Sequence, residues 1–352
     1  MTGPRVVVAG YYPPPFAGEP IHVKQLAGFL RTRGLDAQVL NLNRHAPPSA
    51  EYLWGSTPWK LMRMLFSLSD RQTIVHLHTN GHNWKSWVMI FTAALAARLK
   101  QTRALLTIHS GLFPGYTQTF GPVSRRLARW TLDSFCRVIA VNSEIGRAMR
   151  DLGVSESDLA VIPAFLGVPN GRAIAGTERA LVEGSRPLVV AVAGGDKDPE
   201  MGLPTVIAAL PALIERFPGL RVLFVGWQVG PKTRPLIEAG KLGAHAVCVG
   251  EISHERCLGL LQEADVVVRS TFADGDAITV REALDLGVPV VASDTDFRPA
   301  GVVLFRKGDA ADLVEKLTGV LGSPRDPLDR PADSSQPGRE LWGIYREVGS
   351  IA

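Results

Sequence analysis

Two acidic residues, Asp274 and Glu282, stand in a segment whose pattern predicts binding of a phosphorylated ligand. Residues 269–294 read RSTFADGDAITVREALDLGVPVVASD, in which a strand ends near Ser270 and a helix begins near Ala277. Seven residues separate the two carboxylates, so both can face a ligand that lies over the start of the helix. Free N–H groups and the helix dipole at such a start bind phosphate, and carboxylates accept hydrogen bonds from sugar hydroxyls. The alternative is that this segment is an ordinary loop and helix start of an α/β domain without a binding function.

A second candidate loop follows another predicted strand. Residues 190–210 read VAVAGGDKDPEMGLPTVIAAL, in which the strand leads into Gly194 and Gly195 and a helix begins near Leu203. Glycines let the backbone approach a ligand closely. This loop is therefore a second candidate for ligand binding.

Histidines gather at predicted strand ends in the N-terminal part of the chain. His109 ends the predicted strand 104–108, His76 and His78 share one face of another strand, and His22 lies in the first turn of a predicted helix. A neutral imidazole can hydrogen-bond a sugar hydroxyl. Paired histidines on a strand sometimes bind a metal instead, but we expect no metal here.

The elements that position these residues alternate between β-branched runs and helical periods. This alternation predicts an α/β fold of two doubly wound, Rossmann-like domains, each with a parallel sheet covered on both faces. The predicted domains are residues 1–168 and 188–325, joined by a linker at 169–187 that is rich in Gly, Pro and charge. Ligands of such sheets bind outside the carboxyl ends of the strands, so we expect the domains to face each other across a cleft. The predicted strands are 6–9, 73–77, 104–108, 138–141, 188–193, 221–225, 246–249, 266–268, 288–292 and 302–304.

Composition narrows the functional class. The 352 residues carry a net charge of +4 with no basic run, which gives no argument for nucleic-acid binding. Three cysteines without a C-x-x-C pair argue against a disulfide framework or a zinc site and favour a reducing cytoplasm. The N-terminus lacks the pattern of a signal peptide, and the longest apolar run, residues 87–97, is too short to span a bilayer.

One segment leaves peripheral membrane contact open. Residues 57–71 read TPWKLMRMLFSLSDR, with cations among apolar residues. Such a helix could rest on the inner face of a membrane. A buried helix with its basic face in solvent is the preferred interpretation.

The chain resembles the family-4 retaining glycosyltransferases, which have the GT-B fold and belong to glycosyltransferase group 1. Their signature is Glu, seven residues, Glu, and then Gly-x-Pro-Val-Val-Ala-x-Asp, which Asp274, Glu282 and residues 287–294 match. The resemblance implies that Asp274 holds donor-sugar hydroxyls beside the reacting carbon and that Glu282 holds the ribose. It assigns the diphosphate to the backbone of Ala277, Ile278 and Thr279, and it places Gly275 and Asp276 among the donor-binding residues.

The chain departs from this family in the glycine loop. Asp196 and Met201 occupy the positions of an Arg and a Lys that clamp the diphosphate in the family, while Gly195 and Gly202 are kept. A diphosphate needs cations as well as amides. Lys197 is the expected replacement, and a solvated surface lysine is the alternative.

The N-terminal half resembles the family's acceptor-binding domain. Gly18 matches a glycine near the donor phosphate and the acceptor, and His109 matches the histidine of Thr-x-His-Gly, which borders the reacting carbon. His78 matches a cleft residue near the acceptor that needs no metal, and His22 is an acceptor contact or a helix residue facing the linker. The family also implies that a C-terminal helix, residues 338–352, returns to this domain.

The implied reaction is retaining transfer of a hexose-type sugar from a nucleotide diphosphate sugar, with a UDP-sugar favoured. The acceptor is the hydroxyl of a sugar, glycoside or glycolipid, and neither a cofactor nor a metal is required. Two alternatives remain open at this point. One is a nucleotide-sugar epimerase or hydrolase of the same fold, and the other is a degenerate nucleotide-sugar-binding protein.

Overall fold

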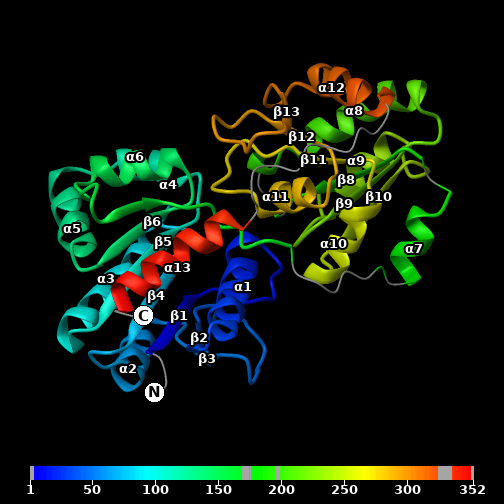
Figure 1. Cartoon of the computed structure of the whole chain (residues 1–352). Helices are drawn as coiled ribbons and strands as arrows, with labels where there is room; N and C mark the ends of the chain where they lie inside the picture. The colour runs from blue at the N-terminus through cyan, green and yellow to red at the C-terminus, as the bar shows by residue number, and fades with distance from the viewer. Residues whose placement is uncertain are drawn as a thin grey trace. The chain divides into compact units, whose positions relative to one another are not determined.

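The chain forms two compact units, which Figure 1 shows in a computed structural model. The structure describes residues 4–168, 174, 176–184, 186–194, 199–323 and 335–349. The first unit comprises the residues up to Pro14, Gly18–Leu166 and the segment from Ser335, and the second comprises Pro15–Ala17 and Gly167–Ser334.

The first unit is built on a seven-stranded sheet in the order β3-β2-β1-β4-β5-β6-β7, with parallel pairing throughout. Its strands are β1 (Arg5–Gly10), β2 (Asp36–Asn41), β3 (Leu53–Trp54), β4 (Ile74–Thr79), β5 (Arg103–Ile108), β6 (Arg137–Ala140) and β7 (Leu159–Val161). Its helices are α1 (Gly18–Thr32), α2 (Pro58–Leu68), α3 (Trp84–Lys100), α4 (Phe113–Gln118), α5 (Pro122–Leu132), α6 (Ser143–Asp151) and α13 (Gln336–Gly349).

The second unit has a six-stranded parallel sheet in the order β10-β9-β8-β11-β12-β13. Its strands are β8 (Leu188–Val192), β9 (Arg221–Val225), β10 (Ala246–Gly250), β11 (Val266–Arg269), β12 (Val290–Ser293) and β13 (Val302–Phe305). Its helices are α7 (Gly176–Val182), a short 3-10 turn (Pro199–Met201), α8 (Leu203–Arg216), α9 (Thr233–Ala239), α10 (His254–Glu263), α11 (Ile278–Asp285) and α12 (Ala310–Gly322).

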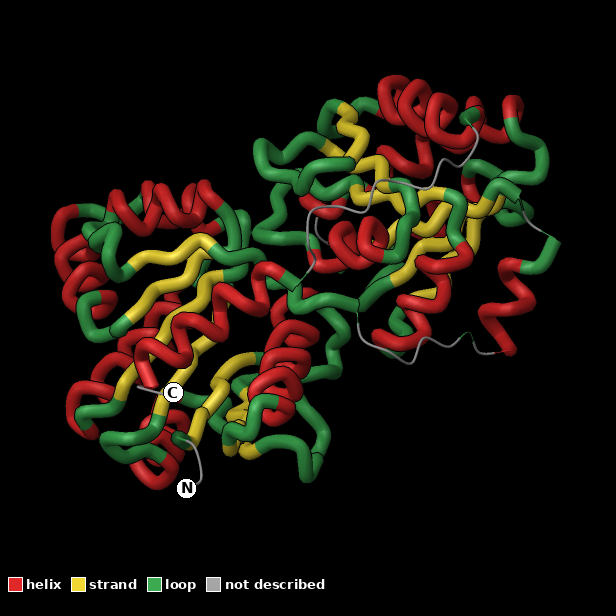
Figure 2. The backbone as a smooth tube through the Cα atoms, in the orientation of Figure 1, coloured by secondary structure: helices red, strands yellow, loops and turns green. Residues whose placement is uncertain are grey.

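Helices cover both faces of each sheet, as Figure 2 shows. Strand β8 illustrates the consequence for sequence, because its side chains alternate between two separate cores. Val189 and Ala191 pack with α8 and α12 on one face, whereas Leu188 and Val190 pack with α10 and α11 on the other. A strand buried on both faces reads as a continuous apolar run, which explains why β8 was visible in the sequence.

The prediction of two Rossmann-like, doubly wound domains is confirmed, and its details differ at several places. The predicted strand 73–77 extends to Thr79 in β4, so His78 belongs to the strand itself. The predicted linker 169–187 contains helix α7. Strands β2, β3 and β7 were not predicted; β3 is exposed, and β7 is largely half-buried and short, so neither carries an apolar run.

The C-terminal helix α13 belongs to the first unit, although residues 167–334 separate it from the rest of that unit. Leu341, Ile344 and Tyr345 are buried in the same core as Val6 and Val8 of β1. The Tyr345 hydroxyl also lies 2.6 Å from Nδ1 of His76 in β4. The last helix of the chain therefore completes a core that begins with the first strand.

Candidate active site

Several predicted site residues lie at or just after the ends of the strands that border the point where the strand order of each sheet reverses. In the first unit this switch point lies between β1 and β4, and in the second it lies between β8 and β11. Ligands of open α/β sheets bind at such points, outside the carboxyl ends of the strands. His78 lies near the end of β4, Gly194 follows β8, and Asp274 follows β11.

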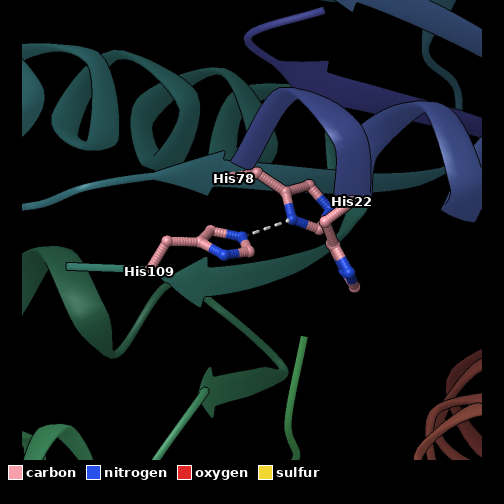
Figure 3. A group of neighbouring side chains, drawn as sticks. All are labelled: His22, His78 and His109. Atoms are coloured by element: carbon pink, nitrogen blue, oxygen red, sulfur yellow. Dashed lines mark hydrogen bonds between the residues drawn. The ribbon is translucent and has the colours of Figure 1, made fainter. Parts of the chain in front are cut away.

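Three histidines from three elements meet in the first unit, as Figure 3 shows. Nδ1 of His78 lies 3.1 Å from Nε2 of His109, and the ring of His22 packs 5.3 Å from the His78 ring and 5.2 Å from the His109 ring between centroids. Nδ1 of His22 lies 3.1 Å from the carbonyl oxygen of Ala164. The structure thus brings together all three histidines that the sequence singled out for the site.

A glycine makes this close meeting possible. Gly10 ends β1, and a Cβ atom there would lie 2.8 Å from Val23 in α1 and 3.0 Å from Cβ of His78 in β4. Either contact would force the helix or the strand to move. Gly10 therefore allows α1 to bring His22 against the end of β4.

Burial keeps these imidazoles neutral. It lowers the pKa of His22 to about 4 and holds the pKa values of His78 and His109 well below the ordinary value, with the neighbouring histidines acting in the same direction for the latter two. A neutral imidazole has one donor and one acceptor nitrogen. The cluster can therefore hydrogen-bond hydroxyls, but it supplies no positive charge.

Gly18 and Glu19 begin helix α1. A Cβ at Gly18 would meet no heavy atom within 4 Å, so packing does not explain the glycine. Glu19 is buried and accepts a hydrogen bond from the Tyr11 N–H at 3.2 Å, and burial raises the pKa of its carboxyl to about 7. Sequence reasoning missed Glu19, whose only signal was an acidic residue in the first turn of a helix.

In the second unit, Asp274 is held by two arginines. Arg269 donates to both carboxylate oxygens at 3.0 and 2.6 Å, and Arg298 donates to Oδ2 at 2.7 Å. Thr271 also donates to Oδ2. Although burial opposes ionisation, the two guanidinium groups keep the pKa of Asp274 far below its usual range. Neither arginine was expected from the sequence, and they occupy most of the carboxylate predicted to hold sugar hydroxyls.

The remaining loop residues lead into α11. Asp276 accepts a hydrogen bond from Arg281 at 2.6 Å and is buried, so its side chain is tied to the helix. Ala277 is the N-cap residue and makes no side-chain cap hydrogen bond to the first turn, which Ile278 and Thr279 open. The start of α11 therefore retains backbone N–H groups suited to an anion.

Glu282 is buried on α11, and its side chain has one hydrogen-bond partner among the described residues. Nε2 of His254, at the start of α10, lies 2.5 Å from Oε1 of Glu282. An ionised carboxylate only accepts hydrogen bonds, so the imidazole is the donor in that state. His254 was not predicted, because it lies 28 positions away in the sequence and no motif links the two residues.

The glycine loop is described only in part. Gly194 donates its N–H to the sulfur of Met201 at 3.4 Å, so the residue at the position where the family resemblance expected a cation contacts the segment just after the end of strand β8. Gly195, Asp196 and Lys197 lie outside the described residues. The predicted phosphate contact of Lys197 therefore stays a prediction.

Comparison with known proteins identifies the family. A model of the glycosyl transferase 4-like domain matches residues 3–164, and a model of the glycosyl transferases group 1 family matches residues 186–323. The chain belongs to the group 1 glycosyltransferases.

Sequence relatives of this glycosyltransferase cover most of its length. The chain is 28% identical over 331 residues to the phosphatidyl-myo-inositol mannosyltransferase of Mycobacterium tuberculosis, covering 88% of this chain and 80% of the relative. It is 29% identical over 334 residues to the enzyme of the same name from Mycobacterium leprae, covering 85% of this chain and 82% of the relative.

A solved structure supports the GT-B fold. Sucrose-phosphate synthase from Thermosynechococcus elongatus aligns with a TM-score of 0.66 at 17% identity, over 98% of this chain and 96% of that one. At this level of sequence identity, the similarity supports a shared fold and nothing more. Among the described helices of the glycosyltransferase, none combines the length and apolar character needed to cross a bilayer.

Proposed function

We propose that this glycosyltransferase moves a hexose-type sugar from a nucleoside diphosphate sugar to an acceptor hydroxyl with retention of anomeric configuration. The observation that carries the proposal is the start of α11, which lies beyond the switch point of the second sheet, has the apolar Ala277 as its N-cap residue and is followed by the buried Glu282. An uncapped helix start attracts a diphosphate, and a carboxylate one to two turns later can accept ribose hydroxyls.

The proposed donor contacts use the start of α11 and Glu282, together with Lys197, which lies outside the described residues. Backbone N–H groups of residues 277–279, with Gly275 before them, bind the diphosphate, and Lys197 adds a cation. Glu282 binds the ribose, oriented by its hydrogen bond to His254. We favour a UDP-sugar and a reaction that needs no metal, because the helix dipole and amides offset the charge of the leaving group.

Asp274 keeps one position for the sugar. Its Oδ2 accepts from Arg269, Arg298 and Thr271, whereas its Oδ1 accepts from Arg269 alone. A carboxylate oxygen has two lone pairs, so Oδ1 is the atom that binds a donor hydroxyl. The arginines fix the carboxylate in place for that contact.

His109 acts on the developing charge. As a neutral imidazole it hydrogen-bonds a sugar hydroxyl near the reacting carbon, and the hydrogen bond with His78 fixes its ring. The nucleoside diphosphate departs from the face of the sugar that the acceptor hydroxyl attacks, which retains the configuration. His22 and His78 serve the acceptor side, and Gly18 lies on the donor side near the phosphate.

The deciding experiment measures donor use and stereochemistry together. The chain is incubated with UDP-glucose or GDP-mannose and a panel of sugar and inositol-containing acceptors, and the anomeric proton coupling of the product is read by NMR. We expect an α-linked product from an α-linked donor. A β-linked product would refute retention. Nucleotide release without transfer would indicate the epimerase or hydrolase alternative, and donor binding without any turnover would indicate a binding protein.

For the acceptor we propose a glycolipid at a membrane surface, because α5 carries an exposed apolar stripe. Val123, Leu127 and Trp130 lie at helical spacing i, i+4 and i+7 and are 83%, 53% and 39% exposed. Arginines 125, 126 and 129 accompany them, and α5 contains no acidic residue. Apolar side chains with flanking arginines fit an anionic lipid surface.

Helix α2, the segment that the sequence suggested for membrane contact, exposes a smaller part of the proposed membrane surface. It buries Leu61 and Leu65 against the unit, as the preferred interpretation expected, yet it leaves Trp59 77% and Phe66 40% exposed. Its exposed aromatic residues are therefore a secondary part of the proposed membrane surface.

Vesicle binding tests the α5 surface. We expect the chain to co-sediment with phosphatidylglycerol-containing vesicles more than with pure phosphatidylcholine, and Leu127→Glu to abolish most of this binding. Leu236→Glu on α9 is the matched control, since Leu236 is 42% exposed outside the stripe. Equal binding by both variants would refute the surface without affecting the proposed donor site.

A further inference from the structure

Four histidines of the first unit gather at the switch point, and they divide by their hydrogen-bond partners. His76 has both ring nitrogens engaged, Nδ1 with the Tyr345 hydroxyl at 2.6 Å and Nε2 with the Thr107 hydroxyl at 2.7 Å. His22, His78 and His109 are not satisfied in this way. One nitrogen from each of these three rings lies within 4.8 Å of the other two.

The tautomer of His22 follows from its partner. The carbonyl oxygen of Ala164 only accepts hydrogen bonds, so the nearby Nδ1 of His22 carries the proton and Nε2 keeps its lone pair. An imidazole held by a backbone carbonyl through one nitrogen and free to bind through the other is the usual arrangement of a metal-binding histidine.

His78 supplies an independent indication of a ligand. Its ring is fully buried, yet Nε2 has no hydrogen-bond partner among the described residues. Burying an unpartnered nitrogen is costly. Nδ1 of the same ring is hydrogen-bonded to Nε2 of His109 at 3.1 Å, and a shared metal ion would replace this bond. The separation is close to the distance of about 3.4 Å between two nitrogens on one tetrahedral zinc ion.

We propose that His22, His78 and His109 bind one divalent transition-metal ion, with Zn²⁺ as the best match. Three imidazole nitrogens without a carboxylate or thiolate suit Zn²⁺, Co²⁺, Ni²⁺ or Cu²⁺ and disfavour Mg²⁺ and Ca²⁺, which prefer oxygen. Three protein ligands leave a fourth position for water. His109 is only partly buried, so it provides the accessible side of the cluster.

The metal would oppose sugar transfer, a consequence that rests on the proposed function. A metal on Nε2 of His109 would replace its hydrogen bond with Nδ1 of His78, which fixes the ring for the sugar contact. We therefore infer that Zn²⁺ inhibits the enzyme at this cluster and that a chelator does not reduce its activity. Binding itself is measured without any sugar, so its failure would leave the proposed function standing.

The test titrates the chelator-treated full chain with Co²⁺ and Zn²⁺. We expect one Co²⁺ per chain with the intense visible bands of tetrahedral coordination, displacement by Zn²⁺, and three imidazole nitrogens by X-ray absorption spectroscopy of the Zn²⁺ form. His109→Ala should weaken Zn²⁺ binding at least about tenfold. His45→Ala, which removes an exposed histidine outside the cluster, should bind like the wild-type chain.

Three results would overturn the proposal. One is a wild-type chain that takes up no Co²⁺, another is a His109→Ala variant that binds Zn²⁺ as tightly as the wild type, and the third is a spectrum with fewer than three imidazole ligands. The spectroscopic count uses the wild-type chain, so it decides the question even if a variant does not fold.

Discussion

The carboxylates of Asp274 and Glu282 come from one sequence motif but have different surroundings. Two arginines and a threonine donate to the first, whereas among the described residues one histidine forms a hydrogen bond with the second. A carboxylate with one partner retains most of its acceptor capacity. Substitution of Glu282 is therefore the more direct test of nucleotide binding.

Glu282→Gln should lower the affinity for a nucleoside diphosphate sugar by about tenfold or more. The amide oxygen still accepts from His254, but ribose hydroxyls lose hydrogen bonds to a charged group, each worth about 1.5–3 kcal/mol. Calorimetric titration with a UDP-sugar gives the comparison. Glu263→Gln, at an exposed carboxylate on α10, is the control. An unchanged dissociation constant in Glu282→Gln would remove Glu282 from the donor site.

Glu19 predicts a pH dependence of stability in the first unit. Burial raises the pKa of its carboxyl from 4.5 to about 7, so the folded chain holds this proton more strongly than the unfolded chain. The stability contribution is complete below pH 4.5, declines as the pH rises toward about 7, and is lost above it. A shift of this size corresponds to about 3 kcal/mol.

Glu19→Gln should therefore be more stable than the wild type at pH 8 and gain nothing at pH 4.5. Urea denaturation at both pH values measures the difference between the two chains. Glu51→Gln, at an exposed carboxylate, is the control for the substitution itself. If the difference between Glu19→Gln and the wild type is equal at the two pH values, the carboxyl does not titrate as described.

At the scale of elements, the sequence predicted the strands that read as apolar runs and missed three strands of the first unit, which are β2, β3 and β7. Central strands such as β1 and β8 are apolar runs buried on both faces, whereas β3 at the sheet edge is two exposed residues long. The partners of the site residues escaped prediction for another reason. Arg298 lies 24 positions from Asp274 in the sequence, and the two side chains meet only because β12 and the loop after it fold beside the loop after β11.

Gly202 and Gly287 allow a matched test of element packing. Both have positive φ, 63° and 72°, but a Cβ at Gly202 would lie 2.0 Å from the carbonyl oxygen of Ser270, whereas one at Gly287 would meet nothing within 4 Å. Gly287→Ala should cost about 1–2 kcal/mol of folding free energy from conformation alone. Gly202→Ala should cost at least about 1 kcal/mol more, because backbone must move.

Chemical denaturation of the two glycine variants measures this difference directly. Equal losses would mean that the loop after β11 moves at little cost in free energy. Gly202 would then not set the distance between that loop and the start of α8. Such a result would also weaken the assignment of this loop to a preorganised donor site, because a loop that moves easily does not hold backbone groups for a ligand.

At the scale of the whole molecule, the chain builds its two units from segments in different ways. The second unit is essentially one continuous segment, from Gly167 to Ser334, with only Pro15–Ala17 added. The first is completed by α13 after that segment, which the family resemblance implied but no pattern in the residues required. Hydrophobic periodicity identifies a helix with an apolar face, but it does not say which of two cores that face covers.

Leu341 of α13 and Leu317 of α12 can distinguish the cores. Both are nearly fully buried, at 3% and 1% exposure, in different hydrophobic clusters. Replacing either by alanine should cost about 2–5 kcal/mol. Because α13 packs on the core of β1, Leu341→Ala should accelerate amide hydrogen exchange in β1 and β4 and leave β8 and β11 unchanged, and Leu317→Ala should do the reverse. Exchange that rises equally in both sheets after Leu341→Ala would show that the units do not open independently.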